Sequence, residues 1–211
     1  MKIIHQTAEY VVVCKAAGED SEHDLPGLLA EQNGDRAADY YVVHRLDKAA
    51  SGLLVLARNR RTAGELSRQL TENRLRKSYL CAVPGVPEPA SGEMQDLLYK
   101  DKMKQKMFPV KRKRAGVKEA SLTYRVLETQ MSLALVEVEL QTGRFHQIRC
   151  QFAARKLPLV GDGKYGSRVR SPHLALFCRT LSFDDPKEKK ELCFTAAPPV
   201  EFPWEIFYDR A

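Results

Sequence analysis

The chain has 211 residues, with 34 lysines and arginines against 27 aspartates and glutamates, and its formal net charge is +7. Its 44% of hydrophobic residues can build a packed core, which excludes a disordered chain. The apolar runs at 53–57 and 131–136 are far shorter than the roughly 18 residues of a membrane helix. The first 15 residues hold a short apolar patch, too short for the core of about 7 residues that a signal peptide needs. We therefore expect a soluble, cytoplasmic protein with no membrane partner.

Cysteines and histidines give no sign of a metal or a disulfide framework. The five cysteines are odd in number, and no two have C-x-x-C spacing: Cys14, Cys81, Cys150, Cys178 and Cys193. We expect reduced, mostly buried thiols. No histidines have metal-binding spacing, and the dinucleotide, Walker and G-x-S-x-G motifs are missing. A reaction without cofactor or metal, based on a carboxylate, is the most that these residues could support.

Positive charge is concentrated in two stretches. Residues 100–118 hold nine Lys or Arg against Asp101 alone, and residues 144–179 hold eight against Asp162 alone. Outside the first stretch the chain has 25 basic and 26 acidic residues and is nearly neutral. Focused positive charge attracts a polyanion, and nucleic acid is the commonest one. The alternative is a solvated basic loop that serves only solubility.

The first half of the chain predicts strands around one helix. Residues 9–14 are of β type, and the acidic region that follows to Asp39 predicts a loop. The apolar run at 53–57 is bounded by Gly52 and Arg58, which is typical of a strand buried on both faces. The next segment predicts a helix with Ala63, Leu66 and Leu70 inward and Glu65, Arg68 and Glu72 outward. Residues 77–83 alternate, which predicts a strand with Tyr79, Cys81 and Val83 on one face.

The second half predicts a loop at 84–92, which is rich in proline and glycine, and then a hairpin of residues 121–128 and 132–140. Ala134, Val136, Val138 and Leu140 are expected to face inward, and Glu137 and Glu139 outward. Residues 146–156 predict a helix with Ile148 and Phe152 inward, followed by a glycine-rich loop at 157–166 and a tail with one strand and a proline-rich extended segment. Strands and helices mix without a βαβ rhythm, so we expect an α+β fold that forms a single domain over residues 1–211.

Two polar segments are candidates for chemistry. Asp47 lies in the segment 44–52, directly before a buried strand, where a carboxylate can be held rigidly; a turn or capping aspartate is the alternative. In the segment 141–149, His146 and Arg149 are three residues apart on one expected helical face, with Arg144 at the helix start, where a phosphate could bind. A plain basic helix end is the alternative there. The glycine-rich loop is a weak candidate for nucleotide binding.

Three blocks of sequence resemble the RluA-type RNA pseudouridine synthases, in the order found in that family. HRLDKAASGLLVLARN, from His44, is similar to H-R-L-D-x-x-T-S-G followed by an apolar strand. KSYLCAVPG, from Lys77, is similar to K-x-Y-x-A-x-V-x-G. QTGRFHQIRCQFAARKLPLVGDGKYG, from Gln141, is similar to R-T-G-R-x-H-Q-I-R-x-H and G-x-P-[LIV]-x-G-D-x-x-Y-G. The resemblance implies the pseudouridine synthase fold, with a mainly antiparallel sheet, in a short member without an S4-type RNA-binding domain.

The resemblance implies isomerisation of a specific uridine in rRNA or tRNA to pseudouridine, without cofactor. Asp47 would be the catalytic aspartate, attacking C1′ or taking the C2′ proton. Tyr79 would stack on the uracil, and Arg149 would pair with the aspartate and keep it ionised. The expected substrate-binding residues are Arg45, which fills the space of the flipped base, Arg144, His146 and Ile148. Flipping the base costs a few kcal/mol, which phosphate contacts could offset. We expect a monomer whose partner is an RNA stem-loop.

The chain also departs from the family pattern. Ala50 stands where threonine is usual, Gln141 where arginine is usual, and Gln151 where histidine is usual. The segments KAAG at 15–18 and HLALFC at 173–178 also differ from the family. None of these changes removes Asp47, Tyr79 or Arg149, so activity is expected. The alternative is a catalytically silent relative that binds RNA during RNA folding or ribosome assembly.

Overall fold

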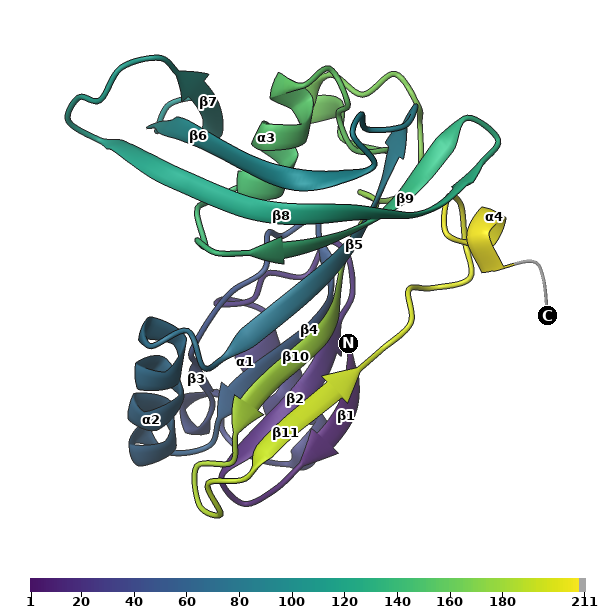
Figure 1. The fold of residues 1–211 in the computed structure, drawn as a ribbon. Helices are drawn as coiled ribbons and strands as arrows, with labels where there is room; N and C mark the ends of the chain where they lie inside the picture. Colours follow the sequence, from purple (N-terminus) through teal and green to yellow (C-terminus); the bar gives the residue numbers. More distant parts are fainter. Residues whose placement is uncertain (209–211) are drawn as a thin grey trace. The chain divides into compact units, whose positions relative to one another are not determined.

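The computed structural model describes residues 1–208, which divide into two compact units (Figure 1). The first unit contains Met1–Lys77 and Phe177–Pro198, and the second contains Ser78–Leu176 and the chain from Pro199 onward. Strands predominate in both units, and no helix of the described residues is long and apolar enough to cross a membrane. The two units are described separately.

The first unit is built on a mixed sheet in the order β1-β2-β4-β10, with β11 paired to β10 and β3 to β4. The β4–β10 pair is parallel and the other pairs are antiparallel. The strands are β1 Lys2–Gln6, β2 Tyr10–Lys15, β3 Tyr41–Val42, β4 Ser51–Ala57, β10 Leu176–Asp184 and β11 Glu191–Thr195. The sequence predicted the strands at β2, β4 and β11 but not β10.

Strand β4 is buried on both faces, as its unbroken apolar sequence predicted. Every residue from Leu53 to Ala57 is 0% exposed, and so are Val11–Val13 on the neighbouring strand β2. Gly52 begins this run with φ +112°, and a Cβ there would lie 2.4 Å from the backbone N and O of Cys178. Glycine is therefore required where β4 and β10 approach each other.

Helix α2 (Arg60–Thr71) packs through a more polar face than predicted. The side chain of Asn59 caps the helix by accepting a hydrogen bond from Thr62 N at 2.9 Å. Leu66 is fully buried, but its buried neighbours are Thr62 and Gln69, while Ala63, Leu70 and Glu65 are half-buried. Gln69 is buried because its amide exchanges two hydrogen bonds, at 2.9 and 2.8 Å, with the backbone of Asp184.

The acidic region up to Asp39 is not a plain loop, which corrects the prediction. It contains helix α1 (Leu25–Asn33) and the short 3₁₀ helix η1 (Ala37–Asp39). Leu25 and Leu29 are 0% exposed and anchor α1, and a proline lies in its first turn, where a backbone donor is not needed. The helix ends at Gly34 with φ +68°.

The second unit is built on an antiparallel sheet in the order β5-β9-β8-β6-β7. Its strands are β5 Arg76–Pro84, β6 Ser91–Asp101, β7 Lys106–Val110, β8 Val117–Gln130 and β9 Leu133–Leu140. The β8–β9 hairpin confirms the prediction, with Met131 and Ser132 at φ 50° and 61° in its turn. Strand β5 places Tyr79, Cys81 and Val83 on one face, but the residues of its other face are buried as well, from Ser78 to Ala82.

The basic stretch at 100–118 contains β-structure that the sequence pattern did not predict. The loop after β5 ends at Ala90, and the long strand β6 runs directly into the stretch. A tight turn leads to β7, where Pro109 is tolerated because β7 is the last strand of the sheet. Charged residues within β6 and the lysine-rich turn at 102–105 conceal the strand pattern.

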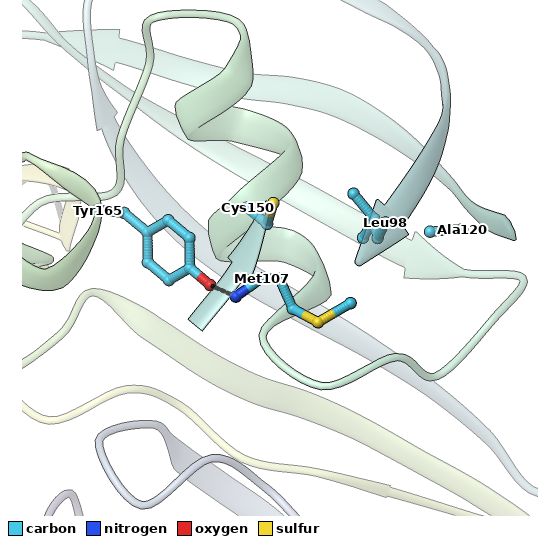
Figure 2. Close-up of a cluster of buried hydrophobic side chains, with 5 residues drawn as sticks. All are labelled: Leu98, Met107, Ala120, Cys150 and Tyr165. Carbon is cyan, nitrogen blue, oxygen red and sulfur yellow. Dashed lines mark hydrogen bonds between the residues drawn. The ribbon is translucent and has the colours of Figure 1, made fainter. Parts of the chain in front are cut away.

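Helix α3 (Gln147–Ala154) packs against one face of β6, β7 and β8. Ile148 and Phe152 are 4% and 0% exposed, as predicted. Figure 2 shows the packing: Cys150 of α3 and Tyr165 meet Leu98, Met107 and Ala120 of the three strands. The Tyr165 hydroxyl oxygen accepts a hydrogen bond from Met107 N at 2.9 Å. Tyr165 ends a 3₁₀ helix, η2 (Gly163–Tyr165), inside the predicted glycine-rich loop, and the tail ends in the short helix α4 (Glu205–Tyr208).

Candidate active site

Asp47 lies in the loop between β3 and β4, and its side chain is half-buried. The carbonyl oxygen of Asp47 accepts a hydrogen bond from Ala50 N at 2.9 Å, which closes a tight turn just before β4. Ala50, at the position where the family usually has threonine, is 2% exposed. The turn therefore attaches Asp47 directly to the most deeply buried strand of the first unit.

Lys15, the last residue of β2, binds the backbone of this loop. Lys15 is 0% exposed, and its ammonium donates hydrogen bonds to the carbonyl oxygens of Ala16 and Glu19 at 2.8 Å and of Lys48 at 3.2 Å. Gly18 N donates to the same Lys48 oxygen at 2.8 Å. Burial lowers the pKa of Lys15 to about 8. The KAAG segment, noted only as a departure from the family, thus fixes the residue next to Asp47.

The residues just before Asp47 alternate between inside and outside. His44 is buried, and its Nε2 accepts a hydrogen bond from Val55 N at 3.3 Å. Burial and the nearby Lys77 hold the pKa of His44 well below its usual value, so the ring is neutral. Arg45 is exposed and forms an ion pair with Glu22 at 2.6 Å. Arg45 is therefore the outward-facing basic residue of this block.

In the second unit, Arg149 and Asp162 form a buried bidentate ion pair. Arg149 Nε donates to Asp162 Oδ2 at 2.7 Å, and Nη2 donates to Oδ1 at 2.8 Å. The two side chains are only 6% and 1% exposed. In the sequence, Asp162 stands out only as a lone acid in a basic stretch. The sequence separation between Arg149 and Asp162 does not predict an ion pair, because the pair joins two different elements, α3 and the loop before η2.

His146 is not part of the helix, which corrects the expectation that it shares a helical face with Arg149. It precedes α3 with a left-handed backbone, φ 49°. Its ring stacks on Phe145 with centroids 3.8 Å apart, and its Nδ1 lies 3.2 Å from the Tyr165 hydroxyl. Helix α3 thus starts one residue later than expected, at Gln147.

The remaining predicted site residues of the second unit differ in exposure. Arg144 is exposed, and its Nε donates to the carbonyl oxygen of Glu119 at 2.9 Å. Tyr79 on β5 is 6% exposed, and Ile148 is 4% exposed. Gln151, where the family usually has histidine, donates to Asp96 Oδ2 at 2.7 Å and to Met94 O at 3.0 Å. Asp47 and Arg45 belong to the first unit, and the other predicted site residues belong to the second.

Among residues 1–208, no group of three or more His, Cys, Asp or Glu side chains could hold a metal ion. All five cysteines lie in this part of the chain, and each carries a free thiol.

A family model described as RNA pseudouridylate synthase matches residues 8–154. The chain belongs to this family, and the resemblance drawn from its three sequence blocks is confirmed. The match covers the loop of Asp47, the strand of Tyr79 and the helix of Arg149.

Curated relatives and solved structures agree with this assignment. A Haemophilus influenzae uncharacterized RNA pseudouridine synthase is 28% identical over 190 residues, covering 87% of this chain and 82% of the relative. A Bacillus subtilis uncharacterized RNA pseudouridine synthase is 34% identical over 162 residues, covering 76% of this chain and 52% of the relative. The ribosomal large subunit pseudouridine synthase D of Neisseria meningitidis is 33% identical over 207 residues, covering 90% of this chain and 54% of the relative. The chain thus spans about half the length of the last two relatives.

The solved structure of human RNA pseudouridylate synthase domain containing 4 matches with a TM-score of 0.76 and 26% identity, covering 94% of this chain and 88% of that one. Human RNA pseudouridylate synthase domain containing 1 matches in fold with a TM-score of 0.80 at 23% identity, covering 94% and 83%. The predicted α+β pseudouridine synthase fold is confirmed.

Proposed function

We propose that this protein isomerises a specific uridine to pseudouridine in a structured rRNA or tRNA, with Asp47 as its catalytic aspartate and without cofactor or metal. The observation that carries the proposal is the family match over residues 8–154, which includes Asp47 in a turn fixed by Lys15 and β4. Family membership supports the class of reaction, and the held loop supports a carboxylate with a defined orientation.

The reaction conserves all atoms of the uridine. The N1–C1′ bond breaks, the uracil turns over, and a C5–C1′ bond forms while C5 loses its proton and N1 gains one. Asp47 would either form a bond to C1′ or remove the C2′ proton to give a glycal. Tyr79 would stack on the uracil and assist removal of the C5 proton. Arg149 would hold the aspartate in its ionised form, because a nearby positive charge favours the carboxylate.

Binding of the substrate would fall to Arg45, Arg144, His146 and Ile148. The exposed guanidinium groups of Arg45 and Arg144 could contact phosphates, and Arg45 could fill the space that the flipped base leaves. Residues 1–211 would work as a single catalytic domain. We further propose that the protein acts as a monomer in the cytoplasm; its free thiols support the location.

The test is an Asp47→Asn variant assayed for RNA binding and for pseudouridine formation on rRNA and tRNA transcripts. The amide preserves the size of the side chain but can neither attack C1′ nor accept the proton. We expect unchanged binding and loss of isomerisation. If the wild-type protein binds RNA but forms no pseudouridine on any transcript or in cellular RNA, it is instead a silent RNA-binding relative.

A further inference from the structure

Two aromatic side chains lie directly opposite each other on β6 and β7. Tyr99 is the register partner of Phe108, and on the other side of β6 it pairs with Val117 of β8. All three side chains are half-buried. Because directly paired residues project to the same face of a sheet, they form one row across three strands.

This row is on the face opposite the core of the second unit. The next residues along the strands, Leu98 and Met107, are buried against Cys150 of α3 and Tyr165 (Figure 2). Since side chains alternate between faces, Tyr99 and Phe108 point away from α3. The half-buried row is therefore a partly exposed apolar surface of the sheet.

Cations cover both rings. The guanidinium of Arg114 lies 5.0 Å from the centroid of Tyr99, and the ammonium groups of Lys104 and Lys106 lie 5.7 and 5.5 Å from that of Phe108. These residues belong to the stretch 100–118, with nine basic residues against Asp101 alone. A polyanion with flat apolar groups complements this surface better than a neutral or acidic protein face.

We propose that Tyr99 and Phe108 form a stacking platform for two unpaired bases of the RNA substrate, while Arg114, Lys104 and Lys106 contact the flanking phosphates. The platform rests on the proposed function, because it adds a binding surface for the same RNA outside the residues assigned to catalysis. Single-stranded nucleic acid is bound by this combination of aromatic faces and basic groups, and a sheet with two outward aromatics can stack two or three bases.

The cations that lie over the two rings can leave the ring faces and bind phosphates of the RNA. A cation over an exposed ring is held only weakly, and a phosphate offers it a full negative charge. When Arg114 and Lys104 turn to phosphates, the ring faces become available to bases. The ammonium of Lys106 also donates to the carbonyl oxygen of Lys164 at 2.6 Å and lies 4.7 Å from the centroid of Tyr165, so it would contact a phosphate with its remaining donors. The rings are held at a fixed spacing by the β6–β7 ladder, so little conformational entropy is lost when a base stacks on them.

The test uses Asp47→Asn protein, so that binding is measured without turnover, and a mixed-sequence single-stranded RNA. Tyr99→Leu and Phe108→Leu should each weaken binding about tenfold. The slope of log affinity against log salt should stay the same, because no charge is removed. Tyr99→Phe and Phe108→Tyr should bind as the parent does, and an RNA of the same length without bases should be insensitive to both leucine variants. Val110→Ala, an aliphatic change near the platform on β7, is the matched control and should bind normally.

A photoreactive 4-thiouridine in the same RNA should crosslink to Tyr99 or Phe108, located by mass spectrometry of the digested complex. Thermal melting verifies that each variant is folded. Unchanged RNA affinity in folded leucine variants, or equal losses with base-free RNA, would overturn the platform. So would tighter binding to an acidic protein than to RNA. Neither binding nor crosslinking requires isomerisation. The platform can therefore be tested even if the proposed reaction fails.

Discussion

The ammonium group of Lys15 lies 3.2 Å from the carbonyl oxygen of Lys48, the residue that follows Asp47. The same ammonium binds two further carbonyl oxygens of the segment Ala16–Glu19. A fully buried lysine is costly unless its donors are satisfied, and here three backbone carbonyls satisfy them. The contact explains how a surface loop can hold a carboxylate in one position.

Replacing Lys15 with methionine is expected to lower turnover about tenfold or more while RNA affinity stays within about twofold. The buried carbonyls lose their donor, so the turn at Asp47 loosens, while the proposed RNA contacts remain. The measurement is single-turnover kinetics with a separate binding titration. Lys2→Met, an exposed lysine on β1, is the control. A Lys15→Met protein that loses RNA affinity in proportion to turnover would show that Lys15 does not position Asp47.

The neutral, buried His44 predicts a pH dependence of stability. The pKa of His44 is lowered in the folded protein, whereas in the unfolded chain it is about 6.5. As the pH falls below 6.5, the unfolded chain takes up a proton that the folded protein excludes, so the free energy of unfolding decreases. The loss cannot exceed about 1.4 kcal/mol per pH unit from this group.

Urea unfolding at pH 7.5, 6 and 5 measures this loss. A His44→Gln variant should be less stable than wild type at pH 7.5, and its free energy of unfolding should decline less as the pH falls to 5. Equal declines in the two proteins would mean that His44 takes up its proton in the folded state as readily as in the unfolded chain.

Breaking the buried ion pair of Arg149 and Asp162 is expected to lower the free energy of unfolding strongly. Asp162→Ala leaves a guanidinium buried without that carboxylate, and such changes cost about 3–5 kcal/mol. Glu137→Ala removes one partner of the more exposed Arg125–Glu137 pair and should cost less than about 1 kcal/mol. Chemical denaturation measures both. Similar small costs for the two variants would show that Arg149 is neutralised mainly by another group.

Removing the charges of residues 111–114 should weaken RNA binding and flatten its salt dependence. Each side chain that contacts a phosphate contributes about 0.7 to 0.9 to the slope of log affinity against log salt. Lys113 already pairs with Glu119 at 2.5 Å, so it should contribute least. The control replaces Lys187, Lys189 and Lys190 with glutamine in the first unit. If the slope of log affinity against log salt changes only in the control variant, the RNA does not contact residues 111–114.

Much of the fold follows from local sequence patterns. The strand at 53–57 and the hairpin around Met131 are predictable because burial of a whole strand or of one face leaves a direct hydrophobic signature. Helix α1 was missed because only a few buried leucines mark it within an acidic segment. Strands β6 and β7 were missed because charged residues and Pro109 interrupt their apolar pattern, and a long-range ladder rather than local propensity stabilises them.

The site shows the same division. Asp47 and Arg149 could be selected because their sequence blocks resemble those of a family. Lys15 and Asp162 could not, because their roles depend on contacts with residues far along the chain, and a buried lysine or aspartate looks like a surface residue in sequence. A lysine that ends an otherwise apolar β-run was the one available hint.

The most direct test of the central claim is pseudouridine mapping of total RNA from cells that carry or lack this gene, using a reagent that marks pseudouridine and stops reverse transcription. The account predicts that one or a few sites in rRNA or tRNA disappear without the gene. A plasmid copy of the wild-type gene should restore them, and an Asp47→Asn copy expressed at the same level should not. Restoration by Asp47→Asn, or no change at any site while the protein is expressed, would contradict it.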